Sequence, residues 1–149
     1  MKKFNFILLF SCILSFYNFD SDDWFLVSKP DNIKSITYDL FNIHFLADNG
    51  IYSYNPINNE FSYNNDLSYS LIDEDKYYIY YHKSIDYFFV FTENYILYKS
   101  SVASYWNKRQ LSTFNIYSFF SIDKIGFSNQ NLIIKYNNNY MSIDLFTMN

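Results

Sequence analysis

Two histidines, His44 and His82, are the residues of this chain best suited by type to acid–base chemistry or metal binding. Neither has a further histidine or a carboxylate at a spacing typical of a metal-ligand or catalytic motif. His44 falls within a predicted strand and His82 at the end of another. We therefore interpret both as structural histidines.

Two acidic runs could supply the oxygen ligands that calcium prefers. They are Asp20-Ser21-Asp22-Asp23 and Asp73-Glu74-Asp75. Neither run has the ligand spacing or the glycine of a calcium-binding loop, so we interpret both as solvated acidic turns. The sequence predicts no metal site and no cofactor.

No motif for nucleophilic catalysis or phosphate binding is present: there is no Gly-x-Ser-x-Gly, no glycine-rich phosphate loop and no His-Glu-x-x-His. The chain has 15 acidic residues, and any two of them could be imagined as a glycosidase pair, so their presence carries no prediction. We predict a non-enzymatic protein with no catalytic residues. The net charge of −4 and the scattered lysines argue against nucleic acid as a partner.

The N-terminus has the pattern of a secretory signal peptide, which we place at about residues 1–19. Two lysines precede the apolar run 4–16, and an acidic stretch follows it. We expect an exported protein, located in the periplasm, at the outer membrane or outside the cell. The alternative is an apolar segment that remains attached. Leu9-Phe10-Ser11-Cys12 loosely resembles a lipoprotein acylation box, which leaves lipidation of Cys12 as a further alternative.

Composition favours strands over helices throughout the rest of the chain. Half of the residues are hydrophobic and 24% are aromatic, a bias that suits pleated sheets. Only two glycines are present, so we expect asparagine to take the left-handed positions in turns. The length of 149 residues fits one domain.

A repeat of about 43 to 46 residues divides residues 20–149 into three units, near 33–66, 76–111 and 115–149. Each unit has an apolar strand, a turn, a second strand, a tight turn and a third strand. The first strands are predicted at 36–38, 79–81 and 125–127, the second at 43–47, 87–91 and 132–136, and the third at 51–54, 95–98 and 140–143. Fourth strands are predicted at 60–63 and within 101–111, and an additional strand at 24–28. A period of this length built from short strands is typical of β-propeller blades.

The turns between the second and third strands carry asparagine in every unit. Asp48-Asn49-Gly50 has the Asn-Gly pair that favours positive φ angles in a type I′ hairpin turn. Glu93-Asn94 and the asparagine run 137–139 are predicted to form weaker versions of that turn.

The first unit, from Ile36-Thr37-Tyr38-Asp39 through 43–55, resembles the two-component-regulator-type β-propeller repeat. The second unit keeps Thr92 at the position of the family's threonine, but Asn94 replaces the glycine, as Asn139 does in the third. The resemblance implies an all-β fold of antiparallel four-stranded blades, here an open arc of about three. It also implies an exported sensing or scaffolding role in the bacterial envelope, with no shared catalytic residues.

Three blades are too few to close a ring, and two explanations remain open. The chain is a fragment of a longer envelope or secreted protein, or identical chains associate to complete the ring. We predict a binding or scaffold module whose partner is a protein or a glycan, with the mature chain not spanning a membrane. Tyr77, Tyr78, Tyr80 and Tyr81 are candidate contact residues, but we favour the alternative that these side chains alternate between the blade core and the sheet surface. The alternative function is that of a small outer-membrane β-barrel protein.

Overall fold

A computed structural model describes residues 30–68 and 75–149. The predicted signal peptide, Cys12, the strand at 24–28, the acidic run 20–23, Asp73 and Glu74 lie outside the described residues.

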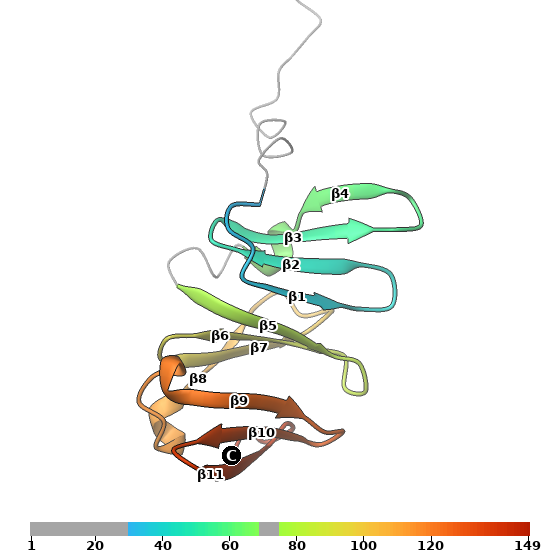
Figure 1. Cartoon of the computed structure of the whole chain (residues 1–149). Coiled ribbons are helices and arrows are strands. Elements are labelled where there is room, and N and C mark those ends of the chain that lie inside the picture. Colours follow the sequence, from blue (N-terminus) through green and yellow to red (C-terminus); the bar gives the residue numbers. More distant parts are fainter. Residues whose placement is uncertain (1–29, 69–74) are drawn as a thin grey trace, which may run out of the picture.

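Three separate antiparallel sheets make up most of the described chain (Figure 1). Within each sheet the strands follow one another in sequence order, so every sheet is a meander of hairpins. The first sheet contains β1 (Ser35–Tyr38), β2 (Ile43–Ala47), β3 (Gly50–Asn55) and β4 (Glu60–Tyr63). The second contains β5 (Lys76–His82), β6 (Tyr87–Thr92), β7 (Tyr95–Ser100) and β8 (Asn107–Gln110), and the third contains β9 (Ile122–Phe127), β10 (Asn131–Tyr136) and β11 (Asn139–Asp144). The predicted all-β, antiparallel class is confirmed, and the described strands form no closed sheet.

Helices are limited to three short segments in the described residues, as the sequence predicts. They are α2 (Asn65–Ser68), η3 (Leu111–Phe114) and η4 (Phe119–Ser121). Asn64 precedes α2, and its side-chain oxygen accepts the Leu67 N–H at 3.0 Å. This is the capping role that asparagine commonly has at a helix start.

Asparagine does take the left-handed positions that glycine would otherwise occupy. Five of the seven described non-glycine residues with positive φ are asparagines. The type I′ turn, however, is not where Asn-Gly predicts it. Neither Asp48 nor Asn49 has a positive φ, whereas Asn137 and Asn138 in the third sheet have φ of 47° and 63°. Gly50 instead begins β3, where it pairs with Ala47.

The sheets stack with their first strands side by side, so that β1 lies against β5 and β5 lies near β9 (Figure 1). Thr37 Oγ1 accepts the Tyr81 N–H at 2.9 Å, and Ser35 Oγ lies 3.3 Å from both N and O of Ile79. Each of these contacts joins residues 44 positions apart. This separation between the first and second sheets is close to the spacing of the sequence repeat.

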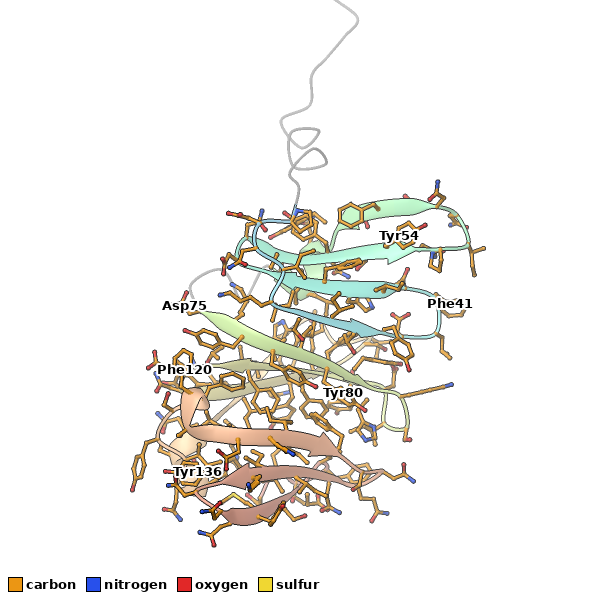
Figure 2. All side chains as sticks on the ribbon, in the orientation of Figure 1. Phe41, Tyr54, Asp75, Tyr80, Phe120 and Tyr136 are labelled. Atoms are coloured by element: carbon orange, nitrogen blue, oxygen red, sulfur yellow. The ribbon has the colours of Figure 1, made fainter. Side chains whose placement is uncertain are left out.

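Two hydrophobic clusters fill the two spaces between the sheets (Figure 2). Between the first and second sheets the fully or nearly buried side chains are Leu46, Ile51, Leu67, Ile79, Tyr81, Phe88, Val90 and Leu97. The larger cluster, between the second and third sheets and the chain around η3, includes Phe89, Phe91, Ile96, Leu111, Ile116, Leu132, Ile134 and Ile143. Successive residues of β6 therefore point into different clusters, which explains its continuous apolar run.

Gly50 supports a close contact that no other residue type permits. Its φ is +139°, and a Cβ at this position would lie 2.5 Å from Cε2 of Tyr63. We expect Gly50→Ala to lower the free energy of unfolding by more than about 2 kcal/mol, because backbone strain and overpacking add together. Gly126→Ala is the matched control within a single chain, since a Cβ there meets no atom of its own chain within 4 Å. Urea denaturation of both variants tests this, and equal effects would contradict it.

Candidate functional site

The turn between β1 and β2 is organised by the carboxylate of Asp39. Its Oδ1 accepts the N–H groups of Phe41 and Asn42, each at 2.7 Å. Its Oδ2 lies 2.8 Å from Nε2 of His44, the second residue of β2. A side-chain carboxylate that accepts N–H groups two and three residues ahead is a standard way to hold a tight turn. The chain reverses here, which brings Asp39 and His44 together.

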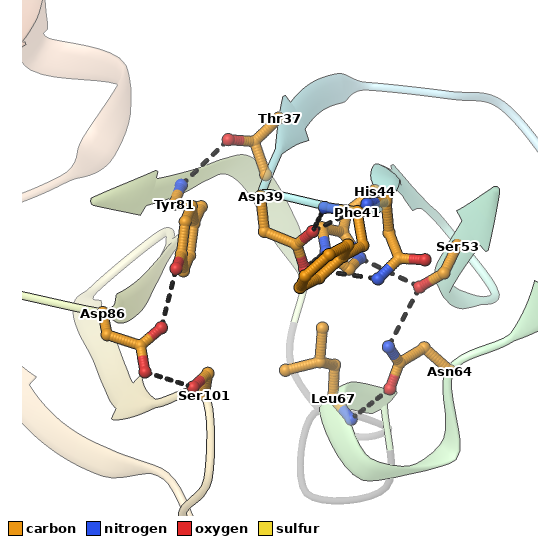
Figure 3. A network of polar contacts seen from close by, with 11 residues as sticks. Thr37, Asp39, Phe41, His44, Ser53, Asn64, Leu67, Tyr81, Asp86 and Ser101 are labelled. Carbon is orange, nitrogen blue, oxygen red and sulfur yellow. Dashed lines mark hydrogen bonds and ion pairs between the residues drawn. The ribbon is translucent and has the colours of Figure 1, made fainter. Parts of the chain in front are cut away.

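His44 also connects Asp39 to Ser53 of β3, and Ser53 in turn contacts Asn64 at the start of α2 (Figure 3). Its Nδ1 lies 2.9 Å from Oγ of Ser53, which also accepts the side-chain N–H of Asn64 at 3.0 Å. When Nε2–H donates to the Asp39 carboxylate, Nδ1 accepts the proton of the Ser53 hydroxyl. Every polar atom of the His44 ring is therefore hydrogen-bonded.

Asp39, His44 and Ser53 together have the residue types of a serine-nucleophile triad. In that arrangement the imidazole polarises the hydroxyl, and the carboxylate orients the imidazole. Here, however, His44 is 2% and Ser53 8% exposed, and both point toward the second sheet, where the Phe88 ring lies edge-on to His44 at 5.0 Å. A nucleophile must reach its substrate, and this hydroxyl is covered. The arrangement is suited to holding the turn.

Asp39 is held in its ionised form by these contacts. Burial, the largest single influence, raises the pKa of its carboxyl, but the bonds from Phe41, His44 and Asn42 together outweigh burial. The net effect leaves the pKa of Asp39 below its ordinary value. The carboxylate is consequently a permanent acceptor at neutral pH.

A cleft of about 390 Å³ opens between the β1–β2 turn and the β5–β6 turn. It is lined by Asp39, Leu40, Phe41, Tyr81, Lys83, Asp86 and Ser101. The lining includes Asp39 but not His44 or Ser53. A cleft of this size falls within the range that holds small ligands or a few side chains of a partner.

Three polar side chains of the second sheet and its turns line this cleft: Tyr81, Asp86 and Ser101. The Tyr81 hydroxyl donates to Oδ1 of Asp86 at 2.7 Å, and the Ser101 hydroxyl donates to Oδ2 at 2.5 Å (Figure 3). Burial raises the pKa of Tyr81 to about 12, and the hydrogen bond to Asp86 acts in the same direction. Tyr81 therefore keeps its proton at neutral pH.

Two apolar side chains from the first sheet's turn stand over the cleft. Leu40 and Phe41 are 63% and 61% exposed. Figure 2 shows Phe41 at the β1–β2 turn. The exposed Lys83, on the second sheet's turn, contributes a cation to the same lining. Apolar, cationic and carboxylate groups thus meet at one end of the two sheets.

His82, the other candidate histidine, lies apart from this site, at the junction of the second and third sheets. Its Nε2 lies 2.6 Å from the backbone carbonyl of Ser128, to which it donates. Its Nδ1 is buried and has no hydrogen-bond partner. The two histidines therefore do not share a site. Among the described residues no group of three histidine, cysteine or acidic side chains could hold a metal ion.

The candidate tyrosines pack between sheets. Tyr77 stacks on Phe119 at 5.5 Å, and Tyr80 stacks on Phe127 at 4.0 Å. Tyr78 is half-buried against Phe91, and Tyr81 is 8% exposed. Tyr81 alone among them lines the 390 Å³ cleft. The predicted set is thus not a single exposed contact surface.

Sequence reasoning missed both the Asp39–His44 pair and the cleft. The available signal was a carboxylate at the start of a predicted turn, followed five residues later by a histidine in the next strand. Such a spacing is common to any short hairpin, so only the register of β1 on β2 shows that the two side chains meet. The cleft depends on the placement of two turns 44 residues apart.

No helix in the described part of the chain is long and apolar enough to cross a membrane. Comparison with protein-family models, with curated proteins and with solved structures returned no match.

The ionised Asp39 predicts a specific pH dependence of stability. We expect Asp39→Asn to lower the free energy of unfolding by about 1–3 kcal/mol at pH 7, because hydrogen bonds to the charged acceptor are weakened. A lowered native pKa contributes stability above the unfolded pKa, so the difference from wild type should shrink as pH falls below about 4. Urea denaturation from pH 7 to pH 3 measures it.

The control for this experiment is Asp123→Asn, because the Asp123 side chain is 48% exposed and lies 3.7 Å from Lys135. An exposed pair of this kind contributes about 0–1 kcal/mol. A difference between Asp39→Asn and wild type that stays constant down to pH 3 would contradict the assignment.

Proposed function

We propose that the chain is a non-catalytic, exported binding or scaffold module built from three β-propeller-type blades. The observation that carries the proposal is the stack itself. Each sheet is a meander, and the first strands lie side by side. Hydrogen bonds join residues 44 positions apart between the first and second sheets and 46 positions apart between the second and third, close to the spacing of the sequence repeat. These are the features expected of consecutive propeller blades, whose first strands line the axis. The resemblance to two-component-regulator-type repeats supports the same reading, and export rests on the signal-peptide pattern.

The binding end is the one at which the β1–β2 and β5–β6 turns meet. Turns at one end of a rigid stack can vary without disturbing the core, and such ends are where scaffolds of this kind present contact groups. The cleft there combines the exposed Phe41 and Leu40 with Lys83 and Asp86. We propose that it engages a short segment of a protein or a glycan, because both offer apolar faces edged by polar groups.

The proposal of a non-catalytic role rests on the burial of Ser53 and on its use as a hydrogen-bond acceptor for Asn64. A fluorophosphonate probe labels serine nucleophiles that a histidine activates and that solvent can reach. We expect it to leave Ser53 unmodified in the folded protein, as read by intact mass and peptide mapping. Stoichiometric labelling of Ser53 that is lost in His44→Ala would overturn the non-catalytic reading.

Phe41→Ala tests the cleft as the binding site. Chitohexaose and casein serve as glycan and polypeptide probes, titrated against the protein while amide and aromatic NMR signals are followed. We expect one probe to shift signals of Phe41, Tyr81 and Ser101, and the variant to weaken that binding about tenfold or more, the effect of losing a central aromatic contact.

Ile57→Ala is the matched control, because Ile57 is 76% exposed on the β3–β4 turn and does not line this cleft. It should bind as wild type does. Shifts confined to residues outside the cleft, or equal losses in the two variants, would refute the assignment.

A further inference from the structure

Among the described residues 30–68 and 75–149, the first sheet has one face that no other sheet covers, although its side chains are those of an interior. Residues directly opposite one another in antiparallel strands share a face. Two such rows cross all four strands of this sheet on the side away from the second sheet. We name this the outer aromatic face, and its residues are Ile36, Phe45, Tyr52 and Tyr63 in one row, and Tyr38, Ile43, Tyr54 and Phe61 in the other.

The second sheet has the same rows, and there they are buried. Ile79, Val90 and Leu97 form the row that corresponds to Ile36, Phe45 and Tyr52. Ile79 is 1% exposed where Ile36 is 58% exposed. Tyr81 is 8% exposed where Tyr38 is 75% exposed.

The third sheet repeats this arrangement. Its corresponding row is Ile125, Ile134 and Met141, and Ile134 is fully buried. In both the second and the third sheet, this face is covered by the preceding sheet of the stack. The outer aromatic face is thus built to be covered in the same way.

At the other end of the stack, the third sheet has a face of different chemistry, which no other described element of sheet structure covers. Its rows are Gly126, Ile133 and Ser142, and Lys124, Lys135 and Tyr140. In the first and second sheets the corresponding face covers the next sheet. Here Ile133 is 40% and Tyr140 75% exposed. We name this the outer lysine face.

We propose that the outer aromatic face binds the outer lysine face of a second copy of this chain. Two copies related by a twofold axis form two identical interfaces of this kind. Each copy contributes three sheets, and together the two copies complete one closed ring. The inference rests on the blade-type architecture proposed above. A second copy is the expected partner of the outer aromatic face because each chain also has the complementary outer lysine face.

The pairing follows the packing already present between the second and third sheets. There Tyr80 stacks on Phe127 at 4.0 Å, with ring planes 10° apart. Gly126 occupies the position in the third sheet that corresponds to Tyr80, and the space above it is open, since a Cβ would meet nothing within 4 Å. Tyr38 corresponds to Phe127. The Tyr38 ring of one copy therefore fills the open space over Gly126 of the other.

The two faces also suit cation–π contact. Lys124 and Lys135, the latter 3.7 Å from Asp123, bring two cations onto a face rich in aromatic rings, whose π systems attract cations. The molecule already uses this contact internally: Nζ of Lys108 lies 3.6 Å from the ring centroid of Tyr95, and Nζ of Lys34 lies 5.1 Å from that of Tyr77. The apolar stems of the two lysines cover apolar surface at the same time.

Sedimentation equilibrium of the purified chain tests the pairing, and we expect twice the mass of one chain. Tyr38→Lys places a third cation opposite Lys124 and Lys135, and should weaken dimerisation about tenfold or more. Because Tyr38 is 75% exposed, this variant should fold, which far-UV circular dichroism checks. The matched control is Tyr117→Lys, since Tyr117 is 76% exposed and lies on neither face. It should dimerise as wild type does.

Cysteine cross-linking tests the orientation, in a Cys12→Ser background. Tyr38→Cys and Gly126→Cys are made in separate chains, mixed and oxidised. The second sheet separates the two positions within one chain, so their disulfide can form only between copies. We expect the mixture to yield a covalent heterodimer, and each variant alone to yield little.

Three outcomes would overturn the proposal. A monomer at every concentration would mean that a further blade of a longer chain, or another partner, covers the outer aromatic face. Efficient cross-linking of Tyr38→Cys alone would mean that two aromatic faces pack together. Equal effects of Tyr38→Lys and Tyr117→Lys would remove the face from the interface. In each case a chain that still binds its probe through the Phe41 cleft leaves the proposed function standing.

Discussion

The second sheet excludes solvent from both of its faces. Ile79 and Val90 are buried on the side of the first sheet, and Phe89 and Phe91 on the side of the third, all at 1% exposure or less. Burial of apolar side chains contributes about 25 cal/mol per Å² of surface, so this two-sided contact is the main source of stability in the molecule. An isolated four-stranded meander would bury only a fraction of this apolar surface. The other two sheets depend on the second for their cores.

This dependence makes the two end sheets different from the middle one, and different from each other. The first sheet keeps interior residue types on its outer side, with Phe61 stacked on Tyr52 at 5.7 Å and Tyr63 edge-on to it at 5.2 Å. These aromatic contacts partly cover the face from within, and Tyr52 is only 1% exposed. The third sheet instead carries Lys124 and Lys135 on its outer side. Within the described residues, the outer side of the first sheet is therefore aromatic, whereas the outer side of the third sheet combines lysines with the exposed Tyr140.

The repeat in the sequence predicted the strands closely, because each strand in this stack has strong local signals. Ile43–Ala47 and Glu60–Tyr63 form as predicted, and the other strands extend the predicted ones or, like Asn107–Gln110, lie within them. Turn geometry was predicted less well. Asn49-Gly50 was expected to make the type I′ turn, but Asn49 has no positive φ and Gly50 begins β3, where the Tyr63 ring lies over it. The asparagine run 137–139, predicted as a weaker version of that turn, has the positive φ angles at Asn137 and Asn138.

The candidate site could not be predicted for a related reason. In the second sheet, the positions that correspond to His44 and Ser53 are Phe89 and Tyr98, which pack in the larger cluster. The first sheet places a polar pair at the same point of an apolar interface. Hydrogen bonds to every polar atom make such a pair far less costly, because an unpaired buried polar group costs about 1–3 kcal/mol. Asp39 and Asn64 supply the missing partners from a turn and from a helix start. The buried His44 therefore holds the β1–β2 turn through Asp39. Because Phe41 of this turn lines the cleft, one side of the cleft is anchored to the core between the first and second sheets.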